Sequence, residues 1–92
     1  MAFEINLSGK TAMITGVSSG IGAGIAKMYA RANADIAGCA IEPEDHEGVQ
    51  QFIQSVQNES GKTPLYVQAD VTHLVQLENF VTRTIKHFGT IN

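Results

Sequence analysis

Three short apolar runs alternate with three longer segments of helical period, and this alternation constrains the fold more than any other feature. The runs cover residues 10–15, 35–41 and 64–69, and each has the length of a buried strand. Strands that are joined by helical segments should be parallel, with right-handed connections. The sequence therefore predicts an α/β fold in which a doubly wound parallel sheet has the strand order 3-2-1 and carries three helices.

The helical segments place apolar residues three or four positions apart, which is the spacing of one helix face. Residues 20–32 carry the first face, residues 49–56 the second and residues 74–88 the third. These faces consist of Ile21, Ile25, Met28, Tyr29 and Ala32; of Val49, Phe52, Ile53 and Val56; and of Leu74, Leu77, Val81, Ile85 and Phe88.

Turn residues predict where the helices begin and end. Pro43 lies where a loop leads into the second helix, and Gly61 is expected to end that helix in the left-handed conformation. Thr72 is expected to cap the third helix, which Gly89 closes. His87 falls in the last turn of that helix, where the helix dipole favours a cation.

The composition indicates one small globular domain, with 92 residues of which 43% are hydrophobic and 16% charged. A net charge of −3 with only six Lys and Arg argues against a nucleic-acid partner or an anionic membrane. No signal peptide is expected, and no apolar stretch approaches the roughly 20 residues of a membrane span. Cys39 is the only cysteine, so no internal disulfide can form, and a cytoplasmic location is expected.

A glycine-rich turn, Thr-Gly-Val-Ser-Ser-Gly-Ile-Gly at residues 15–22, follows the first predicted strand and opens the first helix. Gly16 permits a sharp exit from the strand, Gly20 lets a pyrophosphate approach the backbone, and Gly22 lets the helix pack closely. The helix N-terminus directs free N–H groups toward the phosphates. A tight turn without a ligand is the other interpretation, but three spaced glycines exceed what a turn requires.

The spacing Gly-x-x-x-Gly-x-Gly resembles the cofactor fingerprint of the short-chain dehydrogenase/reductase (SDR) family. Two further stretches agree with this family: Ala-Asp-Val-Thr at residues 69–72 and His-Phe-Gly-Thr-Ile-Asn at residues 87–92. The resemblance covers nearly the whole chain in register. It implies that residues 1–92 are the N-terminal part of a single NAD(P)-binding Rossmann domain.

The resemblance implies cofactor-binding residues in three segments. Those of the glycine turn, which would line the pyrophosphate and the adenosine ribose, are Gly16, Ser18, Ser19, Gly20, Ile21 and Gly22. Asp70 would accept a hydrogen bond from the adenine amino group, and the Val71 backbone would meet the ring. As the alternative, Asp70 assists Thr72 at the start of the third helix.

The end of the second strand bears on the choice between NAD and NADP. Ala40 stands where an NAD-specific member of the family has aspartate, and Ser19 and Ile41 stand where basic residues mark NADP. Glu42 lies 20 residues after Gly22, near the spacing of a ribose-binding acid. The acidic loop that follows would repel a 2′-phosphate, so NAD is favoured over NADP. The other acids of this loop are interpreted as a solvated helix start.

The resemblance implies an NAD(P)-dependent oxidoreductase that transfers hydride between a nicotinamide cofactor and an alcohol or carbonyl, as a homo-oligomer (a tetramer or dimer). The family's Asn-Asn-Ala-Gly segment, catalytic serine and Tyr-x-x-x-Lys pair are not in this sequence, since Asn33 and Asp70 follow Tyr29 and Tyr66 at that offset. No residue is therefore assigned a catalytic role. The alternative is a short, non-catalytic nucleotide-binding or interaction module.

The end of the sequence and its histidines lead to three further expectations. A fourth strand should follow Ile91–Asn92, and without it the first strand would have an open edge beside uncovered apolar helix surface. His46, His73 and His87 lack metal-ligand spacing and should lie at the surface or at helix ends. Cys39 is expected to be a small buried strand residue.

Overall fold

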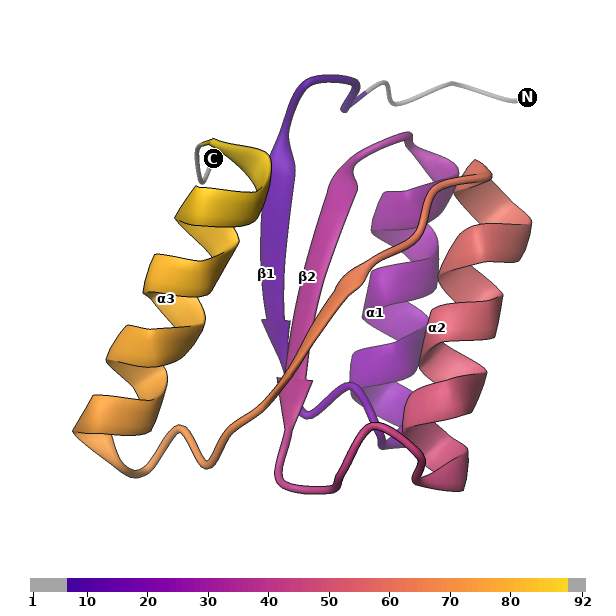
Figure 1. Cartoon of the computed structure of the whole chain (residues 1–92). Helices are drawn as coiled ribbons and strands as arrows, with labels where there is room; N and C mark the ends of the chain where they lie inside the picture. The colour runs from indigo at the N-terminus through magenta and orange to yellow at the C-terminus, as the bar shows by residue number, and fades with distance from the viewer. Residues whose placement is uncertain (1–6, 90–92) are drawn as a thin grey trace.

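In the computed structural model, which describes residues 7–89, three parallel strands lie between helices on both faces of the sheet (Figure 1). In chain order the elements are β1 (Thr11–Thr15), α1 (Gly20–Arg31), β2 (Asp35–Ala40), α2 (Glu47–Ser60), β3 (Leu65–Gln68) and α3 (Leu74–Phe88). The strands lie in the order β1-β2-β3, and both neighbouring pairs are parallel. The predicted order 3-2-1 is thus confirmed.

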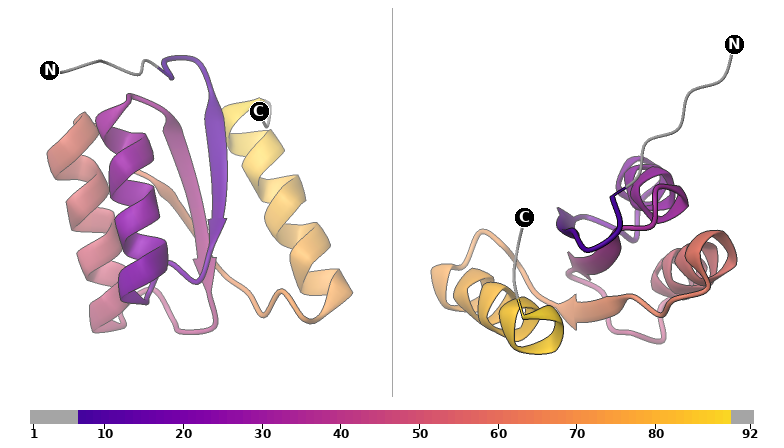
Figure 2. Two further views of the ribbon diagram at one scale, coloured as in Figure 1. Left: turned by 180° about the vertical axis from the view of Figure 1, so that it is seen from behind. Right: turned by 90° about the horizontal axis from the view of Figure 1, so that it is seen from above.

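Helices α1 and α2 lie side by side on one face of the sheet, and α3 covers the other face (Figures 1 and 2). Side chains alternate between the faces along β2, as the pleat of a strand requires. Ile36 and Ala40 belong to the core beneath α1 and α2, whereas Ala37 and Cys39 belong to the core beneath α3. Because β2 is buried on both faces, its sequence is a continuous apolar run.

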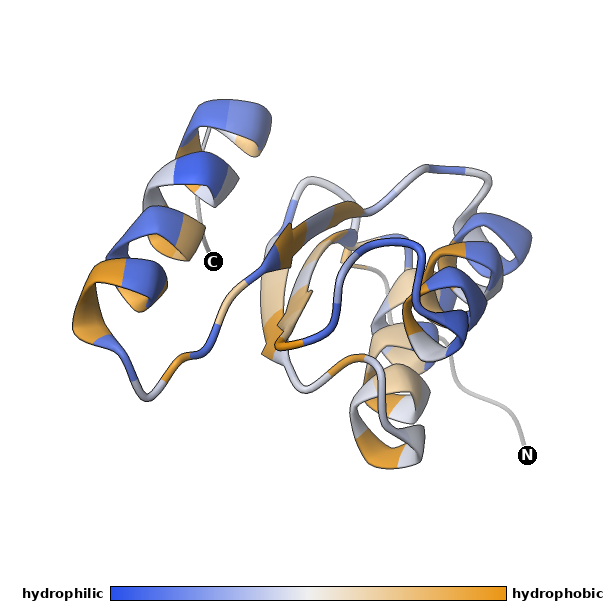
Figure 3. Cartoon of the chain, turned by 60° about the horizontal axis from the view of Figure 1, so that its bottom comes forward, coloured by the Kyte–Doolittle hydropathy of each residue, from blue (hydrophilic) through white to orange (hydrophobic). Residues whose placement is uncertain are grey.

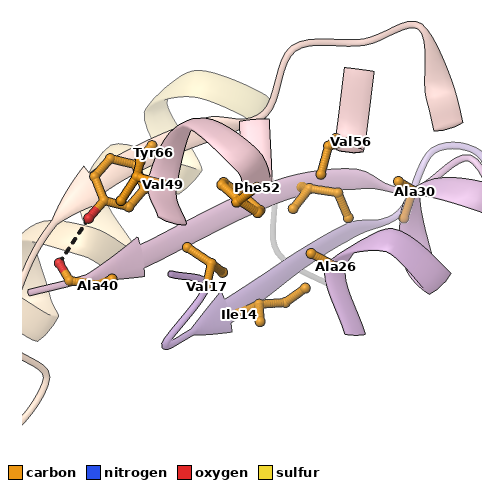
Figure 4. Packing of buried hydrophobic residues seen from close by; sticks show 11 residues of the cluster. Ile14, Val17, Ala26, Ala30, Ala40, Val49, Phe52, Val56 and Tyr66 are labelled. Atoms are coloured by element: carbon orange, nitrogen blue, oxygen red, sulfur yellow. Dashed lines mark hydrogen bonds between the residues drawn. The ribbon is translucent and has the colours of Figure 1, made fainter. Parts of the chain in front are cut away.

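The larger core lies between the sheet and the helix pair (Figure 4). From α2 it takes Val49, Phe52 and Val56, all buried, and Ile53 packs against it, so the predicted face of this helix is confirmed. Gly38 of β2 makes room for the largest of these side chains. A Cβ at Gly38 would lie 2.6 Å from Cζ of Phe52, so a larger residue there would push the ring out of the core.

Helix α1 forms where it was predicted, but the prediction of its buried face is wrong. The residues that α1 buries are the small ones, Gly22, Ala26 and Ala30, which follow one another at intervals of four. Ile21 is 81% exposed and Met28 is 70% exposed. Small residues bring this helix close to the sheet and to α2, while the large apolar residues lie on the side turned away from both.

Helix α3 also buries a different set of residues from the one predicted. Phe80 and Thr84 are its buried residues, and the Thr84 hydroxyl is satisfied by the Phe80 carbonyl at 2.8 Å. Of the predicted face, Leu77, Val81 and Phe88 are half-buried, whereas Leu74 and Ile85 are exposed. The first turn of α3 is hydrophobic and lies away from the sheet (Figure 3).

The helix ends agree with the predicted glycine caps but not with the predicted N-cap. Gly61 and Gly89 follow α2 and α3 with φ of 73° and 87°, as expected for left-handed caps. The prediction of Thr72 as the N-cap of α3 is wrong: His73 holds that position and makes no side-chain cap. His46 is the N-cap of α2, and its Nδ1 accepts a hydrogen bond from the Gly48 amide at 3.0 Å.

Among residues 7–89, β1 forms an edge of the sheet and pairs only with β2, as expected. Residues 90–92, where the chain would lead into the expected fourth strand, lie outside the described residues. None of the helices in the described part of the chain combines the length and the apolar character needed to cross a membrane.

Candidate cofactor site

The carboxyl ends of the three strands meet at one edge of the sheet, at the bottom of Figure 1. A pocket of about 270 Å³ lies there. It is lined by Thr15, Gly16, Ser18, Ser19, Cys39, Ala40, Ile41, Glu42, Ala69, Asp70 and Val71. In open α/β sheets, this edge is where ligands bind.

The glycine turn between β1 and α1 forms one wall of the pocket. Gly16 adopts a φ of 70°, which a residue with a side chain rarely does, and its carbonyl accepts hydrogen bonds from the amide and the hydroxyl of Ser19 at 3.2 and 2.8 Å. A Cβ on Gly22 would lie 2.2 Å from the Gly16 carbonyl oxygen, so only glycine allows this contact. A Cβ on Gly20 would meet nothing within 4 Å, which leaves open space in front of the helix.

The N-terminus of α1 offers partners for an anion. Ser19 is the N-cap residue but makes no side-chain cap, and the first turn contains no acidic residue. The first N–H groups of a helix have no partner within the helix, and they carry the positive end of its dipole. A pyrophosphate placed in the open space beside Gly20 would therefore meet N–H donors and no carboxylate from the first turn of α1.

Glu42 stands at the end of β2 and faces the glycine turn. Its Oε2 accepts a hydrogen bond from the Ser18 hydroxyl at 2.8 Å. This bond is the main reason why the pKa of the Glu42 carboxyl lies below its ordinary value, with a smaller contribution from its own backbone. An ionised carboxylate is therefore held at the wall of the pocket, where it can accept hydrogen bonds from hydroxyl groups.

Asp70 and Val71 follow β3 and close the other side of the pocket. Oδ1 of Asp70 accepts hydrogen bonds from the amide and the hydroxyl of Thr72 at 3.0 and 2.6 Å, and these bonds lower the pKa of the Asp70 carboxyl. Oδ2 lies 3.3 Å from Nε2 of His73. Asp70 thus organises the turn that enters α3, and this is why Thr72 is not the cap: its hydroxyl is directed back to Asp70.

Most of the predicted site residues come together around this pocket. The exceptions are Gly20, Ile21 and Gly22, which are not in its lining: Gly22 packs beneath the turn and Ile21 is directed to solvent. Thr15, Cys39 and Ala69 line the pocket and were not predicted as site residues. What these three residues share in the sequence is their position, because each lies within two residues of the end of a predicted strand.

The cysteine and the histidines of the described chain occupy structural positions rather than positions suited to catalysis or metal binding. Cys39 is 1% exposed, and burial raises the pKa of its thiol to about 11, so the thiol stays protonated and inert at neutral pH. The predicted positions of the histidines are confirmed, since His46 and His73 are N-cap residues and His87 lies in the last turn of α3. Residues 7–89 contain no group of three or more side chains that could hold a metal ion.

A parallel three-stranded sheet with a glycine turn and an acidic strand end defines a dinucleotide-binding type of α/β domain. A family model described as "short chain dehydrogenase" matches residues 10–92. The chain therefore belongs to the short-chain dehydrogenase family, which confirms the resemblance noted in its sequence.

Individual relatives agree with this assignment. The hydroxynaphthalene reductase of Aspergillus fumigatus is 34% identical over 86 residues, which are 94% of this chain and 30% of the relative. Xanthoxin dehydrogenase of Arabidopsis thaliana is 30% identical over 86 residues, with the same coverage of 94% and 30%. The chain thus spans about a third of the length of the curated relatives it matches.

Solved structures share the fold. A short-chain type dehydrogenase/reductase from Mycobacterium marinum matches with a TM-score of 0.86 and 32% identity, over 95% of this chain and 34% of the other. Carveol dehydrogenase from Mycobacterium avium, determined in complex with NAD, matches with a TM-score of 0.83 over 95% and 34%. The identity to the latter is 24%, so this match shows the fold alone.

Proposed function

We propose that this chain is the cofactor-binding portion of an NAD(P)-dependent oxidoreductase and that it prefers NAD to NADP. When bound, the nicotinamide ring would exchange a hydride with an alcohol or carbonyl substrate. The residues of this chain would bind and orient the dinucleotide. The proposal extends to a cytoplasmic homo-oligomer, as the resemblance to the family implies, and assigns no catalytic residue within residues 1–92.

The fit of a dinucleotide rests on the N-terminus of α1 and on the residues that follow β3. The uncapped N-terminus of α1 and the open space at Gly20 suit the pyrophosphate. Asp70 and Val71 line the pocket where the adenine would be placed, and Oδ2 of Asp70, which lies 3.3 Å from Nε2 of His73, would accept from the adenine amino group. With these residues, the pocket would bind the adenosine half of the cofactor.

The preference for NAD is carried by one observation: the Glu42 carboxylate is held against Ser18 of the glycine turn at 2.8 Å. Ribose hydroxyls that reach this carboxylate can donate hydrogen bonds to it, and charge-assisted bonds of this kind are among the stronger ones. A 2′-phosphate at the same place would meet a fixed negative charge in a partly buried site. NAD is therefore expected to bind more tightly than NADP.

The test is calorimetric titration of the purified protein with NADH and with NADPH. We expect tighter binding of NADH. Glu42→Gln should weaken NADH binding by about tenfold and strengthen NADPH binding, because it removes the negative charge that favours ribose hydroxyls and repels a 2′-phosphate. Glu44→Gln makes the same charge change two residues further on, outside the pocket lining, and should leave the preference nearly unchanged. Tighter NADPH binding by the unmodified protein, or equal effects of the two substitutions, would contradict the proposal.

A further inference from the structure

The three peptide carbonyls that follow one another at the end of β2 all accept hydrogen bonds from β3 or from the residue after it. The Ala40 carbonyl accepts from the Ala69 amide at 2.9 Å and from the Tyr66 hydroxyl at 3.1 Å. The Ile41 carbonyl accepts from Nε2 of Gln68 at 3.0 Å. The Glu42 carbonyl shares the single hydrogen of the Tyr66 hydroxyl with the Ala40 carbonyl. Side chains of β3 thus hold the chain segment that leaves β2.

Tyr66 is the firmer of the two side-chain anchors. Its ring is buried in the larger core, 7% exposed, and lies 6.4 Å from the Phe52 ring at a tilt of 57°. Figure 4 shows the hydroxyl directed from this core to the carbonyl of Ala40. Burial, followed by the nearby Glu42 carboxylate, raises the pKa of Tyr66 to about 12, so the hydroxyl keeps its hydrogen and remains a donor.

Beyond Glu42, the loop is held by the Gln50 side chain, which donates to the Glu44 carbonyl at 2.7 Å, and by the His46 amide, which donates to the Pro43 carbonyl at 3.0 Å. Neither bond reaches the backbone of residues 40–42, so Tyr66 and Gln68 supply the side-chain anchors of that segment. Residues 43–47 are exposed, and α2 begins only at Glu47. A carboxylate on an exposed loop samples many positions, and ordering it when a ligand binds costs affinity. With its own carbonyl fixed by Tyr66, Glu42 instead reaches Ser18 from a defined backbone position.

We propose that Tyr66 is a positioning residue for cofactor selection: its hydroxyl fixes the segment Ala40–Glu42 so that the Glu42 carboxylate meets the adenosine ribose. The inference rests on the proposed function, because it assumes that Glu42 contacts this ribose. Gln68 acts on the same segment through the Ile41 carbonyl, as the weaker anchor, since its own side chain is exposed.

The test compares Tyr66→Phe with the unmodified protein by calorimetric titration with NADH and NADPH. Phenylalanine keeps the ring contact with Phe52 and removes only the hydroxyl, so the fold should persist. We expect NADH affinity to fall by up to about tenfold and NADPH affinity to stay the same or rise, because the variant loses the placement of Glu42, which favours ribose hydroxyls and repels a 2′-phosphate. Tyr29→Phe removes a hydroxyl from the exposed side of α1 and should change neither affinity.

Two further measurements separate a positioning role from a general structural one. In a Glu42→Gln background, Tyr66→Phe should no longer change the ratio of the two affinities, since the side chain that it positions is gone. In the protein without cofactor, Tyr66→Phe should let the pKa of the Glu42 carboxyl rise toward its ordinary value, as seen in an NMR titration. Gln68→Met, at an exposed position, should produce the same changes to a smaller extent.

The outcomes distinguish this inference from the proposed function. If the protein prefers NADH and Tyr66→Phe leaves the ratio unchanged, the role of Tyr66 is overturned while the cofactor preference stands. If the protein does not prefer NADH, the proposed function fails. The role of Tyr66 in placing Glu42 is then decided by the NMR titration, and an unchanged Glu42 pKa in Tyr66→Phe overturns it.

Discussion

Single residues set both the shape and the charge of the candidate site. Gly22 brings α1 against the turn that leaves β1, Gly20 leaves space in front of the helix, and Gly24 lies on the exposed side of the same helix. These three residues are chemically identical, but a Cβ added to each would have different surroundings. Replacing each by alanine should therefore have three different results.

Gly22→Ala should destabilise the fold by about 2 kcal/mol or more, because the new Cβ would lie 2.2 Å from a backbone oxygen that cannot move without opening the turn. Gly24→Ala, with nothing within 4 Å, should stabilise it by about 0.5–1 kcal/mol through helix propensity. Gly20→Ala should leave stability nearly unchanged and weaken NADH binding roughly tenfold by filling the space beside the pyrophosphate. Urea denaturation gives the stabilities and calorimetry the affinity; equal stabilities of the Gly22 and Gly24 variants would contradict the assigned contacts.

The pH at which the Glu42 carboxylate gains a proton depends on Ser18, whose hydroxyl donates a hydrogen bond to this carboxylate and lowers its pKa. A carboxyl whose pKa is lower in the folded than in the unfolded chain stabilises the fold above the unfolded pKa, and this contribution is lost as the pH falls through the folded pKa. Ser18→Ala should raise the pKa of Glu42 toward its ordinary value and reduce the part of the pH-dependent stability that this carboxyl contributes. NMR titration of the carboxyl carbons measures it.

Asp70 is the internal control for this titration. Its pKa is lowered mainly by Thr72, so Ser18→Ala should leave it unchanged. A Glu42 pKa that stays low without the Ser18 hydroxyl, or a parallel change at Asp70, would show that Ser18 is not the cause.

At the scale of elements, helix period predicted that α1 exists but not which face it buries. The largest apolar residues of α1, such as Ile21 and Met28, mark a face that the described part of the chain leaves exposed. The buried face is made of glycine and alanine, whose small side chains give a weak hydropathy signal although they decide how closely the helix packs. For α2 no such conflict arises, because its large apolar residues are also the buried ones.

The corrected face of α1 predicts opposite costs for two substitutions. Ala26→Leu would force a large side chain between α1 and the sheet, where Ala26 is fully buried, and should destabilise the fold by about 1–3 kcal/mol. Met28→Ala removes a large side chain that is 70% exposed and should change stability by less than about 0.5 kcal/mol. Urea unfolding of both variants measures these changes in stability. If Met28→Ala destabilised the fold and Ala26→Leu did not, the buried face would be the one predicted from the sequence.

At the scale of the whole molecule, the topology and the place of the site could be predicted for one reason. Parallel strands bring their carboxyl ends to the same edge, so residues far apart in the sequence, such as Ser18, Glu42 and Asp70, had to lie near one another. The roles of Tyr66 and Gln68 could not be predicted in this way. The role of Gln68 depends on the register between β2 and β3, which pairs it with Ala40. Tyr66 lies in an apolar run of the sequence, which gives no sign of where its hydroxyl is directed.

We expect this edge of the sheet to hold NAD, with Glu42 at the adenosine ribose. The most direct measurement is the set of backbone amide shifts in an NMR titration of the protein with NADH. We expect the largest shifts in residues 16–22, 40–42 and 70–71. The amide shift at Glu42 should be lost when the protein is titrated with nicotinamide mononucleotide, which lacks the adenosine. Unchanged amides in these three segments would contradict binding at this edge of the sheet. Shifts concentrated in the polar groove of Lys27, Gln54 and Glu59, between α1 and α2, would contradict it as well.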